Sequence, residues 1–228
     1  MPSTIENNIA KVRARILSAL QKVQRDEQSM TLMAVSKTRS AEMIRAAASC
    51  GICDVGENYL QEALDKQTEL EGTDLVWHFI GPIQSNKTRP IAEHFDWVHS
   101  VDRLKIARRL SEQRPSHLPA LNICLQLNIS DEDSKSGVST EELPRLARQV
   151  SELPQLRLRG IMAIPKACEQ FDQQRAIFHR VNQAFSALQQ DHPSIDTLSM
   201  GMSQDMEAAI AEGANIVRIG TDIFGPRQ

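Results

Sequence analysis

The fold is decided by a stretch that reads Thr31-Leu32-Met33-Ala34-Val35-Ser36-Lys37-Thr38. It is a short apolar run that ends on a lysine, a pattern typical of a buried β-strand with a polar end. In an α/β barrel, the carboxyl ends of the strands carry the chemistry. This stretch alone allows two interpretations of Lys37: a functional amine at a barrel mouth, or a lysine that caps a strand and points into water.

Apolar runs of the same kind recur along the chain and alternate with helical patterns. We expect strands at 31–36, 53–57, 75–80, 97–100, 121–129, 156–164, 197–200 and 216–219. A helix or helical turn follows each strand, and an extra amphipathic helix, 5–24, precedes the first. Near-continuous apolar strands alternating with helices indicate a parallel sheet covered by helices. Eight such units favour one domain over 1–228, a closed (β/α)8 TIM barrel, and an open doubly wound sheet is the alternative.

The composition excludes several classes of protein. The 228 residues are 41% hydrophobic, which is ordinary for a globular protein, and the net charge of −3 argues against a general nucleic-acid binder. No apolar stretch approaches the roughly 20 residues of a membrane span. The charged N-terminal segment, 1–24, does not read as a secretory signal. Four cysteines without an export signal indicate reduced thiols, so we expect a cytoplasmic protein that binds neither nucleic acid nor membrane.

One C-x-x-C pair, Cys50 and Cys53, raises the question of redox or metal chemistry. No second pair follows it, and the pair straddles a predicted helix end and the next strand. We therefore interpret both cysteines as small core residues and expect no metal site.

The loops after the last two predicted strands have the composition of a phosphate site. One of them reads Ser199-Met200-Gly201-Met202-Ser203, which is small and hydroxyl-bearing and opens a helix whose free N–H groups attract anions. The other carries Gly220 and Thr221, and a glycine lets a phosphate approach the backbone closely. TIM barrels often bind phosphate with these two loops. Ser203 has a second interpretation as a helix N-cap, which is compatible with the first.

Arg218 lies inside the last predicted strand, two residues before Gly220. A guanidinium there is costly to bury unless it has a partner. It either pairs with an acid such as Glu57 or Asp222, or donates to a ligand atom beside the phosphate. A lysine on the first strand, a phosphate site in the last two loops and this arginine could together hold pyridoxal phosphate (PLP). Lys37, as a neutral amine, would attack the aldehyde of PLP.

Five ordered motifs carry a resemblance to a known family. They are Ala34-Val35-Ser36-Lys37-Thr38, Gly56-Glu57-Asn58-Tyr59, Trp77-His78-Phe79-Ile80-Gly81-Pro82-Ile83-Gln84-Ser85-Asn86-Lys87, Ser199-Met200-Gly201-Met202-Ser203-Gln204-Asp205-Met206 and Val217-Arg218-Ile219-Gly220-Thr221. From about Val12 to Arg227 the chain resembles the pyridoxal phosphate homeostasis protein family. The resemblance implies a PLP fold-type III barrel, like the N-terminal domain of alanine racemase, with the cofactor held as a Schiff base on Lys37.

The resemblance also implies which residues surround the cofactor. Arg218 would face the pyridine nitrogen. The phosphate would be surrounded by Ser199, Ser203, Gly220 and Thr221. Asn58 and His78, at the ends of the second and third strands, would line the same mouth. His78 has an alternative interpretation as a satisfied histidine in the barrel wall.

Two features bear on whether such a protein is an enzyme. A guanidinium cannot accept a proton, so Arg218 disfavours a protonated pyridine ring. An unprotonated ring withdraws electrons from a substrate carbanion less strongly. Racemases of this fold tolerate the arginine, but a two-base racemase also needs a proton donor opposite the lysine. In the racemases that this chain resembles, the donor is a tyrosine from a separate β-domain. The sequence ends shortly after the last strand and its only tyrosine is Tyr59, so we expect no such domain.

We therefore expect a non-catalytic protein that binds PLP and serves PLP homeostasis by delivery to PLP-dependent enzymes. A small PLP-dependent racemase or lyase, with Tyr59 or His78 as second base, is the first alternative. A phosphate-binding barrel enzyme without PLP is the second. The missing domain favours a monomer, and the polar loop 130–137 is expected at the mouth, where it would gate the cofactor or contact a recipient enzyme.

Overall fold

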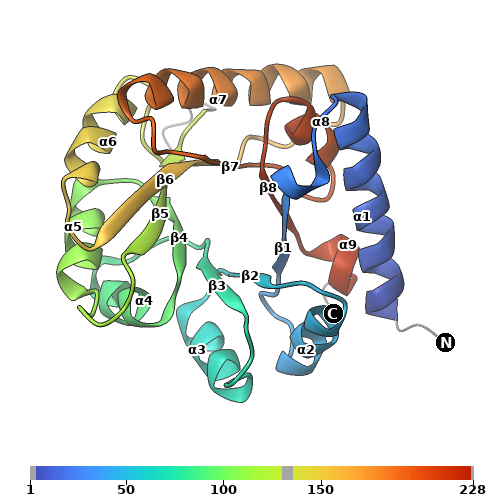
Figure 1. Cartoon of the computed structure of the whole chain (residues 1–228), viewed down its shortest axis with the longest axis horizontal. Helices are drawn as coiled ribbons and strands as arrows, with labels where there is room; N and C mark the ends of the chain where they lie inside the picture. Colours follow the sequence, from blue (N-terminus) through green and yellow to red (C-terminus); the bar gives the residue numbers. More distant parts are fainter. Residues whose placement is uncertain (1–3, 130–135, 227–228) are drawn as a thin grey trace.

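The chain folds into a ring of parallel strands enclosed by helices (Figure 1). The computed structural model describes residues 4–129 and 136–226, and within them eight strands form one closed barrel in sequence order. The strands are β1 (Thr31–Val35), β2 (Asp54–Glu57), β3 (Val76–Phe79), β4 (Trp97–Val101), β5 (Leu121–Leu127), β6 (Leu156–Ala163), β7 (Thr197–Ser199) and β8 (Ile216–Ile219). The predicted TIM barrel is confirmed. The open sheet is wrong, because β8 pairs with β1 and closes the ring.

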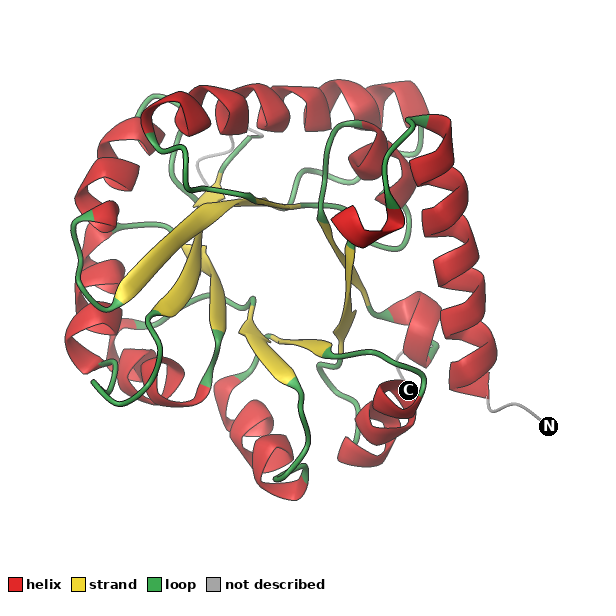
Figure 2. Ribbon diagram, viewed as in Figure 1, coloured by secondary structure: helices red, strands yellow, loops and turns green. Residues whose placement is uncertain are grey.

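Helices cover the outside of the barrel (Figure 2). They are α2 (Ala41–Ser49), α3 (Leu60–Glu69), α4 (Thr88–His94), α5 (Leu104–Gln113), α6 (Leu143–Ser151), α7 (Phe171–Asp191), α8 (Met206–Ala211) and α9 (Thr221–Phe224). Short 3₁₀ turns, η1 (Glu27–Ser29) and η2 (Ser85–Lys87), precede β1 and α4. The predicted loop 130–137 lies outside the described residues, except for its last two positions.

The extra N-terminal helix, α1 (Thr4–Lys22), is confirmed and completes the outer layer. Its apolar stripe, which includes Ile9, Val12 and Ile16, is buried. It packs against α8 and α9 on one side and α2 on the other, as Figure 1 shows at the right of the barrel. The last helix, α9, is a single turn and is too short to cover this sector, so α1 shields it from water instead.

The space inside the barrel is divided between apolar and polar side chains. Met33, Ile80 and Ile216 form a small apolar cluster there. Gly56 is needed beside it, because a Cβ at that position would lie 2.7 Å from the Met33 sulfur. The interior also holds buried polar residues, namely His78, His99, Ser199 and Arg218. Branched apolar residues ordinarily fill a TIM-barrel interior, so these polar side chains call for an explanation.

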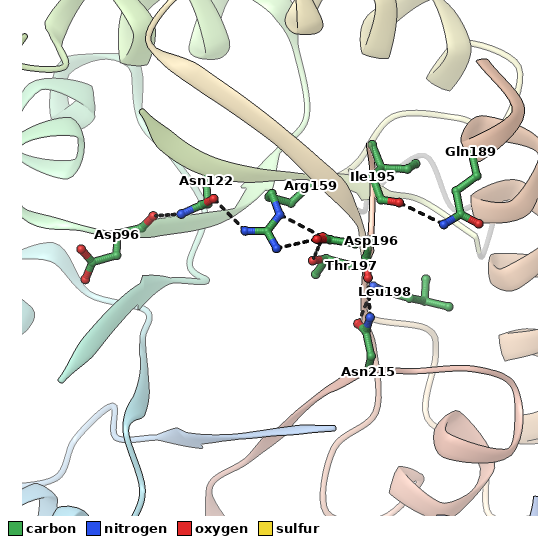
Figure 3. Close-up of polar contacts among 9 residues, drawn as sticks. All are labelled: Asp96, Asn122, Arg159, Gln189, Ile195, Asp196, Thr197, Leu198 and Asn215. Carbon is green, nitrogen blue, oxygen red and sulfur yellow. Dashed lines mark hydrogen bonds and ion pairs between the residues drawn. The ribbon is translucent and has the colours of Figure 1, made fainter. Parts of the chain in front are cut away.

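A hydrogen-bonded network joins the amino ends of several strands (Figure 3). Arg159 on β6 donates to both carboxylate oxygens of Asp196, at 2.9 and 2.7 Å, and to Asn122 Oδ1 on β5 at 2.9 Å. Its guanidinium also lies 4.5 Å from the centroid of the Trp97 ring on β4. Burial opposes ionisation of Asp196, but hydrogen bonds from Arg159 outweigh it, so the pKa of Asp196 lies below its ordinary value. This end of the barrel is therefore tied together, while the carboxyl ends remain available for a site.

The two cysteines of the C-x-x-C pair differ, because Cys50 packs against the core and Cys53 does not. Cys53 is exposed and Cys50 is half-buried, and both thiols are free. The prediction of a core residue is wrong for Cys53, which belongs to the exposed segment that leads into β2, whereas Cys50 at the end of α2 contacts the core. Within residues 4–129 and 136–226, no group of three or more His, Cys, Asp or Glu side chains could hold a metal ion. The helices of the same residues include none with the length and apolar character needed to cross a bilayer.

Candidate functional site

A cavity of about 330 Å³ opens at the carboxyl ends of the strands. Six of the eight predicted site residues line it: Lys37, Asn58, Ser203, Arg218, Gly220 and Thr221. Apolar side chains, among them Val35, Ile80 and Ile164, cover part of its wall. The volume and the mixture of apolar wall and few polar groups are typical of a small-molecule site.

Lys37 reaches the cavity from a strained turn directly after β1. The Arg39 N–H donates to the Ser36 carbonyl at 2.9 Å and closes the turn. Thr38 has a φ of 64°, which is unusual for a β-branched residue. Its N–H donates to Glu62 Oε1 at 2.5 Å, and this bond holds the turn in place. The strained residue of this turn is therefore the direct neighbour of Lys37.

A buried ion cluster supports the same turn from below. Lys66 Nζ on α3 lies 2.7 Å from Glu57 Oε1, 2.5 Å from Glu62 Oε1 and 2.7 Å from the Ser36 carbonyl oxygen. Burial raises the pKa of Glu57, and hydrogen bonds from Lys66 and Ser36 oppose this rise. The cluster fixes both flanks of Lys37. Our reading of the sequence missed it, although Glu62 and Lys66 at helical spacing i, i+4 are a signal for an ion pair.

Two loops form the opposite side of the cavity, as the phosphate prediction requires. Met202 to Asp205 follow β7, and Gly220 to Asp222 follow β8. Gly201 has a φ of 95°, and a Cβ there would lie 2.6 Å from the Cβ of Ala209, so only glycine fits. At Gly220 a Cβ would lie 3.2 Å from the Val35 carbonyl oxygen, so glycine keeps this backbone close to β1.

Ser203 is not a helix N-cap. The helix α8 begins at Met206, and its N-cap position is Asp205, whose Oδ1 accepts the Met202 N–H at 2.6 Å. This capping interpretation is therefore wrong, because the turn from Met202 to Asp205 separates Ser203 from the helix. The hydroxyl-bearing residue lines the cavity instead.

Arg15 on α1 fastens both loops to the outer layer. Its guanidinium lies 2.7 Å from Glu207 Oε1 on α8 and 2.5 Å from Asp222 Oδ2 on α9, and it donates to the Ser203 carbonyl at 2.9 Å. The N-terminal helix thus contacts the segments that carry the predicted phosphate groups. We did not identify Arg15 from the sequence, because its partners lie about 190 and 205 positions away and no local pattern reveals them.

Arg218 lies at the floor of the cavity and is 3% exposed. Its Nη1 donates to the Ser199 carbonyl at 2.7 Å and to Ser199 Oγ at 2.9 Å, and its Nη2 donates to the Ala163 carbonyl at 2.9 Å. Burial lowers the pKa of Arg218 to about 10. The predicted ion pair with Glu57 or Asp222 is wrong, because those carboxylates bind Lys66 and Arg15.

The remaining two predicted residues, Ser199 and His78, do not line the cavity. Ser199 is fully buried and His78 is 1% exposed. Ser199 lies beneath the cavity, where its Oγ accepts from Arg218. His78 contacts His99 and Asp54 through its two ring nitrogens, each at 2.9 Å. Of the two interpretations of His78, the structure therefore favours the histidine in the barrel wall.

Asn58 carries a buried polar atom without a hydrogen-bond partner. Its Oδ1 is buried, and no partner for it exists among the described residues. Buried polar atoms are almost always hydrogen-bonded, so an orphaned amide oxygen needs an explanation. Because Asn58 lies in the cavity wall, a polar group of a bound small molecule would satisfy it. An amide can present either its oxygen or its nitrogen to such a group.

Comparisons with known proteins show the family and the fold of the chain. Residues 4–228 match the model of the alanine racemase N-terminal domain. The pyridoxal phosphate homeostasis protein of Pseudomonas aeruginosa is 61% identical over 226 residues, covering 99% of this chain and 97% of that protein. The protein of the same name from Escherichia coli K12 is 53% identical over 227 residues, covering 98% and 97%. The structure of PipY from Synechococcus elongatus PCC7942 with PLP bound is 37% identical, with a TM-score of 0.86, and the match covers 97% of this chain and 100% of PipY.

Proposed function

Because this chain belongs to the pyridoxal phosphate homeostasis protein family, with the barrel of the alanine racemase N-terminal domain, we propose that it binds PLP in the mouth cavity. It serves to keep the cofactor available to other enzymes and does not turn over a substrate. The observation that carries the proposal is the composition of one cavity. The residues that line it supply an amine, a buried guanidinium, hydroxyl groups from two loops and an amide.

Each residue has a role that follows from its chemistry. PLP would supply an aldehyde, and Lys37 would supply the amine that condenses with it to an imine, with loss of one water. Arg218 faces the ring nitrogen, and its N–H groups can only donate to it. Ser203, Gly220 and Thr221 surround the phosphate with hydroxyl and backbone groups, and Ser199 holds Arg218 from beneath. Asn58 Oδ1 or Nδ2 binds a polar ring substituent.

Neither of the residues considered as a second base, Tyr59 and His78, lines the cavity. Among the described lining residues there is neither a histidine nor a tyrosine. Tyr59, the only tyrosine of the chain, is 54% exposed and does not line the cavity. His78 is sealed beneath the floor with both ring nitrogens engaged. The alternative of a small racemase or lyase predicts solvent deuterium at the α-carbon of a free amino acid, and we expect none during prolonged incubation.

Borohydride reduction followed by peptide mapping tests the cofactor and the lysine together. Reduction fixes the imine, so the wild-type protein loaded with PLP should yield one labelled peptide containing Lys37. The Lys37→Ala variant should yield no label, whereas Lys87→Ala, which changes an exposed lysine outside the cavity, should label as the wild type does. Label on another lysine in wild-type protein would disprove the assignment. Protein that stays colourless with PLP would move the proposal to a phosphate-binding barrel enzyme.

We further infer that the protein delivers its PLP to PLP-dependent enzymes. A PLP-loaded sample, mixed with an apo form of a PLP-dependent enzyme, should restore that enzyme's activity even when a scavenger removes free PLP. Restoration that disappears with the scavenger would indicate release into solution rather than transfer. We further propose a cytoplasmic monomer, which cell fractionation and light scattering would check.

A further inference from the structure

A continuous chain of hydrogen bonds crosses the inside of the barrel. This polar chain consists of Arg218 on β8, Ser199 on β7, His99 on β4, His78 on β3 and Asp54 on β2. At one end, Arg218 Nη1 lies 2.9 Å from Ser199 Oγ, which in turn lies 3.0 Å from His99 Nδ1. At the other end, His99 Nε2 lies 2.9 Å from His78 Nδ1, and His78 Nε2 lies 2.9 Å from Asp54 Oδ1. Neither the family resemblance nor the comparisons assign His99 or Asp54 a role.

The polar chain connects the two faces of the barrel. Arg218 lines the mouth cavity at the carboxyl ends of the strands. Asp54 begins β2 at the opposite face, where its side chain is 26% exposed and lines a second cavity of about 240 Å³. The residues between them are buried, with exposures of at most 1%. Buried polar groups must all be paired to avoid a cost in stability, whereas the apolar side chains that ordinarily fill a TIM barrel carry no such requirement.

The chemistry of the two ends gives the chain one direction. An arginine can only donate, and an ionised aspartate can only accept. His78 therefore donates through Nε2 to Asp54, and as a neutral ring it accepts at Nδ1. His99 then donates through Nε2 and accepts at Nδ1, so the Ser199 hydroxyl donates to it. Every link in the polar chain has one donor and one acceptor when both imidazoles are neutral Nε2–H tautomers.

The surroundings of His99 favour its neutral form. Burial above all, together with the charge of Arg218, holds the pKa of His99 well below its ordinary value. On the other side, His78 stacks on Trp97 with ring centroids 5.5 Å apart, and the Arg159 guanidinium covers the Trp97 ring. Asp54 is the anion that contacts the pair.

We propose that Asp54, His78 and His99 are positioning residues that set the orientation of the Ser199 hydroxyl and thereby fix Arg218 against the ring nitrogen of bound PLP. With its hydrogen directed to His99, Ser199 Oγ presents only lone pairs to the Arg218 guanidinium. The bonds that Arg218 makes to described residues do not use its Nε–H, which is left for a ligand in the cavity. Without Asp54, His78 has no fixed acceptor, and both rings can adopt the other tautomer. The inference rests on the proposed binding of PLP.

The tautomers can be measured without the cofactor. In ¹⁵N-histidine-labelled wild-type protein, two-bond ¹H–¹⁵N correlation spectra distinguish the Nε2–H ring, the Nδ1–H ring and the imidazolium ring. We expect His78 and His99, assigned by single substitutions, to be neutral Nε2–H tautomers at neutral pH. Finding either ring as an Nδ1–H tautomer or as an imidazolium would overturn the proposed direction.

Asp54→Ala tests the effect at the far end of the polar chain. Asp54 lies partly exposed on the opposite face from the PLP cavity, so the change touches no proposed PLP contact. We expect the Kd of PLP to rise at least about fivefold, the lower end for coupling between two separate sites, with a shifted absorption maximum of the bound cofactor. Cys53→Ser changes the exposed neighbour. It should leave the Kd of PLP within about twofold of the wild-type value and the absorption maximum unshifted. An Asp54→Ala protein with the Kd and spectrum of the wild type would refute the inference, whereas a wild type without PLP affinity would refute the proposed function.

A double-mutant cycle tests whether Asp54 acts through Ser199. Ser199→Ala removes the hydroxyl that links the histidines to Arg218. In that background Asp54→Ala should change the Kd of PLP by less than about twofold, because coupled residues are not additive. If the two substitutions reduce the affinity for PLP additively, Asp54 acts by another route, such as general destabilisation, and the proposal is overturned.

Discussion

Ser203 and Thr221 bring hydroxyl groups into the cavity from two loops that are far apart in the sequence. If they bind the phosphate, Ser203→Ala and Thr221→Val should each raise the Kd of PLP about tenfold, because a hydrogen bond to a charged group contributes about 1.5–3 kcal/mol. Pyridoxal, which lacks the phosphate, is the matched ligand. Its affinity, measured by absorbance titration, should be unchanged, and an equal loss for both ligands would contradict the assignment.

The sequence revealed individual residues where their chemistry was conspicuous. A lysine that ends an apolar run and an arginine inside a strand are unusual, and both line the cavity. His99 and Lys66 have no unusual position in the sequence. The partners of His99 depend on the register of neighbouring strands, and those of Lys66 depend on the packing of α3. His78 was placed at the mouth by resemblance alone, whereas the structure buries it beneath the floor.

At the scale of elements, Lys66 holds α3 to β1 and β2 through a buried ion cluster. Its side chain is 6% exposed and that of Glu57 is fully buried. Lys66→Ala leaves a buried carboxylate without its partner, so the free energy of unfolding, measured with urea, should fall by about 3–5 kcal/mol. Lys105→Ala on the exposed face of α5 is the control and should change it by less than about 0.5 kcal/mol. Adding Glu57→Gln to a Lys66→Met variant should recover part of the loss, and no recovery would contradict the ion-pair account.

The network at the amino ends of β6 and β7 should make stability depend on pH. The pKa of Asp196 is lowered in the folded protein, so its contribution is present above the unfolded pKa of about 4 and is lost as the pH falls through the lower folded value. Arg159→Gln should therefore reduce the free energy of unfolding at pH 7, and the difference from wild type should shrink below about pH 4. Urea unfolding of both proteins at pH 7 and pH 3 measures this. A difference that does not vary with pH would assign the role of Arg159 to its contacts with Asn122 and Trp97 instead.

At the scale of the whole molecule, the first helix braces the last two loops. Arg15 on α1 binds Glu207, Asp222 and the Ser203 carbonyl. Arg15→Gln should therefore raise the Kd of PLP by about three- to tenfold, because the loops lose a common support. Arg13→Gln is the control, since Arg13 on the same helix binds the Gly51 carbonyl away from the cavity. Equal effects of both variants in a PLP titration would indicate general loosening of α1.

The sequence by itself determined the barrel, its extra helix and the positions where chemistry emerges. Local patterns suffice for these, because apolar periodicity marks each strand and helix, and in a parallel barrel all carboxyl ends meet on one face. The tertiary structure decided which side chains meet: Arg15 with the loops, Lys66 with Glu57, and the line of polar groups from Arg218 to Asp54. Those contacts depend on strand register and on closure of β8 against β1, which bring together residues that no local pattern relates.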